Sequence, residues 1–231
     1  MQTLAEAALQ GGLYTVPQAA RLLGASHVKV RSWVEGYANS LATPIIRSRI
    51  ERPAKGLVLG FLDLIESAWV QHFLGLGYSL QTIRKVADKL RARTDLEHPF
   101  ACKSRFLADG KSIFEESIGE AGEARILDLM NDNFTMGPII QQSLFDRIFY
   151  VEDVAAQFQP VVETPGIILF PKVANGRPVL KDIWVPTETL YSAYVAEDGD
   201  IAAVADDFRL SLAQVNEAIT FERALRERAL H

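Results

Sequence analysis

Residues 14–34 read YTVPQAARLLGASHVKVRSWV, and this stretch decides the fold of the N-terminal part of the chain. Pro17 suits the first turn of a helix, and Gly24 suits the left-handed residue that ends it. Ser26 is then well placed to cap a second short helix. The inner face of that helix is expected to consist of the apolar residues at helical spacing: Val30, Trp33 and Val34. Two short helices joined by a glycine turn predict a helix-turn-helix.

The outer face of the second helix is expected to be polar and basic. It should present His27, Lys29, Arg31 and Ser32. Lys and Arg side chains bind phosphates, and Arg also reads guanine edges in the major groove. A solvated face on a purely structural helical hairpin has the same pattern, so the pattern by itself leaves both interpretations open.

A basic hairpin is predicted next, with residues 44–50 and 56–60 as two strands around a basic loop. Such a hairpin beside a recognition helix is called a wing, and it contacts flanking phosphates. Helical spacing then predicts one longer helix from Phe61, broken at Gly75, and another that Ser79 caps. The predicted DNA-binding residues are Thr15, Ser26, His27, Lys29, Arg31, Ser32, Arg47, Arg49, Arg52 and Lys55.

Residues 14–35 resemble the opening of the MerR family, in which the helix-turn-helix ends in an Arg-aromatic-aromatic-Glu stretch. Here that stretch reads RSWVE, with Ser32 in the place of the first aromatic. Residues 61–65 and 76–84 resemble the third and fourth helices of that family, so the resemblance covers about 14–93. It implies that Arg31 touches the DNA backbone and that the wing arginines support it. A metal-sensing member is not expected, because the chain has one cysteine.

The charge distribution separates a basic head from an acidic body. The net charge is -5, but residues 1–97 carry 12 Lys and Arg against 8 Asp and Glu, whereas 98–231 carry 12 against 21. Two surfaces of opposite sign favour two different partners.

The C-terminal part is predicted to be a separate helical module. Chain-breaking residues around Pro160 and 164–166 indicate a linker, and Ile167–Phe170 has the pattern of a buried strand. Three helices follow, with predicted N-caps Thr187, Asp200 and Ser211. Residues 201–219 again look like a helix-turn-helix, but their acidic character favours a protein partner over phosphates.

Residues 166–222 are similar to the small trihelical domain of VapB-type antitoxins. The similarity rests on GRPV at 176–179 and VPT at 185–187, while Asp182 stands where glycine is common. A MerR-like head joined to this tail resembles the larger VapB antitoxins, which repress their own operon and neutralise a PIN-type ribonuclease toxin. The resemblance implies three partners: double-stranded operator DNA, a PIN-type toxin and a second copy of the chain in a homodimer.

The predicted fold is therefore mainly α with small β elements, in three parts. Residues 1–97 are expected to form a MerR-like winged helix-turn-helix domain, 98–160 a mixed α/β linker region with a hairpin at 106–114, and 161–231 a trihelical domain. A MerR-like regulator that has no toxin and senses a small ligand through 98–160 is the alternative. A scaffold that uses both helical modules for protein contacts is a third possibility.

Catalysis, metals and cofactors are not expected. The sequence has no G-x-S-x-G, no phosphate-binding glycine loop and no H-E-x-x-H. His98 and Cys102 are four residues apart, but two ligands do not make a structural zinc site. The single cysteine, the absence of a signal-peptide pattern and the absence of a long apolar run predict a cytoplasmic protein without membrane contact.

Overall fold

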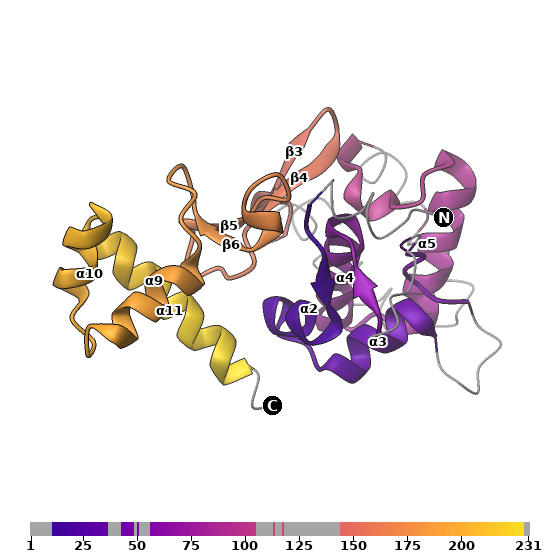
Figure 1. Cartoon of the computed structure of the whole chain (residues 1–231). Helices are drawn as coiled ribbons and strands as arrows, with labels where there is room; N and C mark the ends of the chain where they lie inside the picture. The colour runs from indigo at the N-terminus through magenta and orange to yellow at the C-terminus, as the bar shows by residue number, and fades with distance from the viewer. Residues whose placement is uncertain are drawn as a thin grey trace, which may run out of the picture. The chain divides into compact units, whose positions relative to one another are not determined.

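The computed structural model describes residues 11–36, 43–48, 50, 56–104, 113, 117 and 144–228. The described chain is mainly helical with small antiparallel sheets, as predicted (Figure 1). Its contacts divide it into two compact units. Unit 1 comprises Met1–Ser26, Ile50–Phe61 and Gln157–His231, and unit 2 comprises His27–Arg49 and Leu62–Ala156.

Unit 1 begins with a short strand and helix whose ends match the predicted signals. Strand β1 (Tyr14–Thr15) pairs antiparallel with β2 (Val58–Leu59), and helix α2 (Val16–Leu23) follows directly. Thr15 caps α2 in a capping box, because its hydroxyl accepts from the Gln18 backbone N–H while the Gln18 side chain accepts from the Thr15 N–H. Gly24 ends the helix with φ +63°, a conformation that strains other residues.

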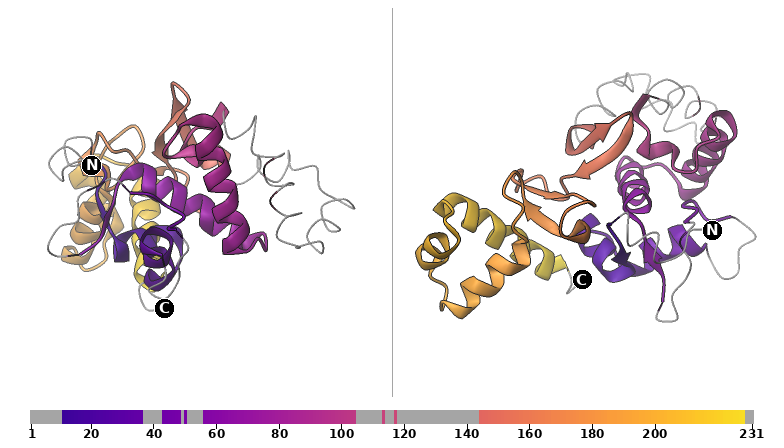
Figure 2. Two further views of the ribbon diagram at one scale, coloured as in Figure 1. Left: turned by 90° about the vertical axis from the view of Figure 1, so that its right-hand side faces the viewer. Right: turned by 45° about the horizontal axis from the view of Figure 1, so that its top comes forward.

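The C-terminal segment of unit 1 packs three helices beside a small sheet (Figures 1 and 2). Strand β5 (Ile167–Leu169) is fully buried and pairs antiparallel with β6 (Pro178–Leu180) and with the end of β4 (Val154–Phe158). A 3₁₀ turn, η3 (Ala174–Gly176), precedes β6. The helices are α9 (Thr187–Ala196), α10 (Ile201–Phe208) and α11 (Leu212–Arg228).

Two of the three predicted caps in this segment are confirmed and one is wrong. The Asp200 carboxylate accepts from two backbone N–H groups of α10, and Ser211 forms a capping box with Gln214 ahead of α11. Pro186, rather than Thr187, is the N-cap residue of α9. The reason is tertiary: the Thr187 hydroxyl is buried and donates to Glu222 of α11.

The N-terminal and C-terminal segments of unit 1 are joined by hydrogen bonds, of which the one from Tyr14 is buried. The Tyr14 hydroxyl donates to the Gly176 carbonyl at 2.9 Å, and the Arg228 guanidinium donates to the carbonyls of Arg21 and Leu22. The fit is close, since a Cβ added at Gly176 would lie 2.5 Å from the Gly12 Cα. This grouping differs from the predicted boundary at 97, because contacts place residues 1–26 with the C-terminal segment.

The described part of unit 2 includes the helices α3 (His27–Glu35), α4 (Phe61–Gly75, of which all but Phe61 belongs to this unit) and α5 (Leu80–Thr94). Helix α4 ends at the predicted breaker, and the Ser79 hydroxyl caps α5 by accepting from Thr82. Two 3₁₀ turns, η1 (Pro99–Ala101) and η2 (Phe145–Arg147), and strand β3 (Ile148–Val151) also belong to the unit. Its core holds an aromatic cluster of Trp69, Phe73, Phe100 and Phe145.

Most of the predicted hairpin at 106–114 lies outside the described residues; Ile113, which is described, is helical and buried. A hairpin does connect β3 to β4, through Glu152 and Asp153 at φ 47° and 72°. Among the described helices, none has the length and apolar character needed to cross a membrane.

Candidate nucleic-acid interface

Helix α3 has one buried side and one exposed side. Val30, Trp33 and Val34 are almost completely buried in unit 2, whereas His27, Lys29 and Arg31 are exposed. The two sides follow from helical spacing, which puts 30, 33 and 34 on one face. The predicted cationic surface of this helix therefore exists in unit 2.

Arg31 is the most informative member of this surface. Its side chain is 56% exposed and lies 3.8 Å from the Glu35 carboxylate, one turn further along α3. An exposed pair at that distance contributes little to stability, because water screens both charges. The guanidinium is consequently available to an external anion at small cost.

The prediction that Ser32 lies on the outer face is wrong. Ser32 is 8% exposed, and its hydroxyl donates to the Lys29 carbonyl at 2.8 Å. A serine that bonds to a carbonyl of the preceding turn is satisfied within its own helix. The residue that sits in the place of an aromatic in the MerR-like pattern is therefore a small core residue here.

The other two small polar residues of the predicted set lie at helix starts. The exposed Thr15 is occupied as the cap of α2, and the exposed Ser26 directly precedes α3. Their positions are those expected for N-caps.

The first strand of the predicted wing is not formed over most of its described length, although its last residue, Ile50, lies in a β-bridge. Pro44 to Ser48 carry no strand, and the Ile46 N–H donates to the Trp33 carbonyl at 3.0 Å. Strand β2 pairs with β1 instead. The physical reason is burial, since Ile45 and Ile46 are both taken into the core of unit 2. Arg49, Arg52 and Lys55 lie outside the described residues.

Arg47 is exposed but engaged. Its guanidinium donates to the Asp88 carboxylate of α5 at 2.7 Å. Arg84, also on α5, donates to the Thr43 carbonyl at 2.8 Å. Both bonds tie the segment that follows α3 to helix α5, so Arg47 has a structural role besides the predicted DNA contact.

The segment that follows α3 is also bonded to a cluster of largely buried charged residues. The cluster consists of Asp63, Glu66, Arg91 and His98. Arg91 donates to the Glu66 carboxylate and to the Ile45 carbonyl, and the Ser48 hydroxyl donates to Asp63. The His98 ring nitrogen Nδ1 lies 3.7 Å from Glu66 and 3.8 Å from Asp63. Sequence analysis missed this cluster because its members are spread over three elements.

The pKa of His98 lies above its ordinary value. Burial alone lowers this pKa, and Arg91 lowers it further, but the carboxylates of Glu66 and Asp63 outweigh both effects. Protonated His98 would compensate the carboxylates of Glu66, which pairs with Arg91, and of Asp63.

Cys102 and His98 do not form a metal pair. Cys102 is buried and its thiol donates to the Asp153 carboxylate at 2.8 Å, whereas His98 faces the acids of α4. In the part of the chain that the structure describes, no group of three ligand-type side chains could hold a metal ion.

The surface of the C-terminal segment around α10 is acidic. Its exposed side chains include Glu197, Asp198, Asp200, Asp206 and Asp207. The exposed arginines of α11 are already matched to aromatic rings of α9. Arg226 lies 4.2 Å above Tyr191, and Arg223 donates to the Tyr194 hydroxyl. The α10 surface disfavours a phosphate backbone, because both are negatively charged.

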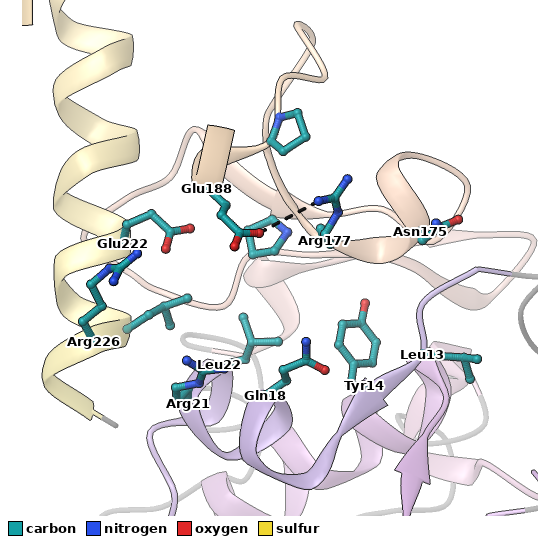
Figure 3. A pocket seen from close by; sticks show the side chains of 13 residues that line it. Leu13, Tyr14, Gln18, Arg21, Leu22, Asn175, Arg177, Glu188, Glu222 and Arg226 are labelled. Carbon is teal, nitrogen blue, oxygen red and sulfur yellow. Dashed lines mark ion pairs between the residues drawn. The ribbon is translucent and has the colours of Figure 1, made fainter. Parts of the chain in front are cut away.

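Unit 1 also contains a polar pocket of about 370 Å³ (Figure 3). Residues of α2 line one side, and β6, α9 and α11 line the other, with Arg177 and Glu188 paired at 3.9 Å. Burial raises the pKa of the Glu222 carboxyl at its base, although the Thr187 hydrogen bond and Arg226 act against that rise. Three arginines and two glutamates line the pocket, so its positive and negative charges largely cancel.

The fold is similar to that of a solved crystal structure. The X-ray crystal structure of Rv2018 from Mycobacterium tuberculosis superposes with a TM-score of 0.71, covering 89% of this chain and 96% of that one, at 20% sequence identity. A likeness at this identity concerns the fold alone. No protein-family model matches the chain, and no curated protein does.

Proposed function

We propose that this chain is a DNA-binding antitoxin that represses its own operon and neutralises a PIN-type ribonuclease toxin by direct binding. The DNA-binding part of this proposal rests on helix α3, which has one buried side and one exposed side. Its apolar side is fixed in the core while His27, Lys29 and Arg31 face solvent. A rigid helix that presents cations outward suits the major groove of a duplex.

The head is accordingly interpreted as MerR-like, with α3 as the recognition helix that follows α2 and the Gly24 turn in the sequence. The sequence resemblance over 14–93 supports this, as does the αL conformation of Gly24. A homodimer on a palindromic operator follows from the same proposal, because two copies of one recognition helix need two half-sites.

The toxin-binding half rests on the tail. Residues 166–222 resemble the trihelical domain of VapB-type antitoxins. The exposed acidic side chains around α10 also disfavour binding to the phosphates of DNA. The tail is therefore assigned to a protein partner and the head to DNA.

The test uses the full chain and a duplex of the DNA directly upstream of its gene. Binding should weaken as salt rises, with a slope near -0.9 for each phosphate neutralised. Arg31→Ala should cost about 1–3 kcal/mol of binding free energy and reduce that slope by about one. Arg223→Ala is the matched control, because Arg223 is an exposed arginine of the acidic tail.

The same variants test the toxin half. The product of the neighbouring reading frame should copurify with wild type and with Arg31→Ala alike, and its ribonuclease activity should be inhibited in both complexes. Unchanged DNA affinity in a Lys29→Ala, Arg31→Ala double variant would refute the DNA assignment. A neighbouring product that neither copurifies nor cleaves RNA would refute the antitoxin assignment and leave a MerR-like regulator.

A further inference from the structure

Helix α3 exposes an apolar side chain in the middle of its cationic surface. Val28 is 62% exposed, although its neighbours His27 and Lys29 are polar and Arg31 lies one turn away on the same side. Val28 is absent from the predicted DNA-binding residues, because the prediction for this helix face rests on polar and charged side chains.

The packing of unit 2 gives no reason for a valine here. The buried side of α3 is already filled by Val30, Trp33 and Val34. Valine is a weaker helix former than alanine or lysine, so an exposed helical position does not favour it. Its exposed methyl groups also leave apolar area in water.

What valine does supply is two methyl groups held in one strongly preferred rotamer. In the major groove, thymine presents a C5-methyl group, which apolar side chains contact. Arg31 lies three residues further on, on the same side of the helix, where the proposed DNA binding would bring it to the adjacent backbone.

We propose that Val28 determines part of the operator sequence, by packing its methyl groups against the C5-methyl group of a thymine. This rests on the proposed DNA binding and adds which base the helix selects. Because valine has no hydrogen-bonding group, its selectivity is for the methyl group and not for the donor and acceptor pattern of the base.

The experiment replaces thymines in the upstream duplex with deoxyuridine, one at a time, and measures affinity by fluorescence anisotropy at one salt concentration. Uracil keeps the hydrogen-bonding edge of thymine and lacks only the methyl group. For wild type, at least one replacement should weaken binding about three- to fivefold, the effect of one buried methyl group. Val28→Ala should bind the thymine duplex more weakly by a similar factor and be indifferent to that replacement.

Val195→Ala is the matched control, since Val195 is a helical valine with 59% exposure on α9. It should keep both the affinity and the uracil effect of wild type. The proposal is overturned if wild type is insensitive to every replacement, or if uracil weakens wild type and Val28→Ala equally. Those results leave salt-dependent DNA binding intact, whereas a chain that does not bind the duplex refutes the DNA assignment and this proposal together.

Discussion

At the scale of single residues, His98 makes the stability of the fold depend on pH, because it lies beside two buried carboxylates. His98 lies next to Glu66 and Asp63, which are 0% and 2% exposed, and Glu66 also pairs with Arg91. Its pKa is raised in the folded chain, so folding favours the protonated form. The stabilisation is fully present below the ordinary pKa of histidine and is lost as pH rises through the raised value.

We therefore expect His98→Gln to lower the free energy of unfolding more at pH 6 than at pH 9. Urea denaturation at both values measures it, with His27→Gln as control because His27 is exposed on α3. A penalty that is equal at the two pH values, or larger at pH 9, would contradict the proposed compensation.

At the scale of elements, helix ends were the most predictable features. The signals at Gly24, Ser79, Asp200 and Ser211 act over a few residues, so the sequence shows both partners of each bond. Thr187 failed as a cap because its hydroxyl partner, Glu222, is 35 residues away. Most of the first wing strand failed likewise, since Ile45 and Ile46 are buried in a core whose other residues lie elsewhere in the chain.

The cap of α2 provides a test at this scale. Thr15→Ala should lower the free energy of unfolding by about 1 kcal/mol, because a backbone N–H of α2 loses its acceptor. Thr15→Ser should retain most of that stability, and Gln18→Ala should show coupling with Thr15→Ala in a double-mutant cycle. If Thr15→Ala weakens DNA binding without any loss of stability, Thr15 contacts DNA directly and is not mainly a cap.

At the scale of the whole molecule, the N-terminal segment folds with the C-terminal one. The bond from Tyr14 to the Gly176 carbonyl spans 162 residues and is buried. Tyr14→Phe should cost about 1–3 kcal/mol, since a buried carbonyl then lacks a donor. Tyr194→Phe removes an exposed hydroxyl and should stay within about 0.5 kcal/mol. Equal unfolding midpoints in guanidinium chloride for Tyr14→Phe and wild type would disprove the link.

The sequence by itself determined the helices, most of their ends and the exposed cations of α3. These depend on local spacing and on capping bonds that span three residues, which a linear pattern contains. Only the tertiary structure decided that Ser32 is buried and that the Thr187 hydroxyl donates to Glu222. It also decided that four charged residues from distant elements form one cluster, and that residues 1–26 belong with the C-terminal segment. Each of those features depends on burial or on a partner far along the chain. Neither of these leaves a local pattern in the sequence from which it could be predicted.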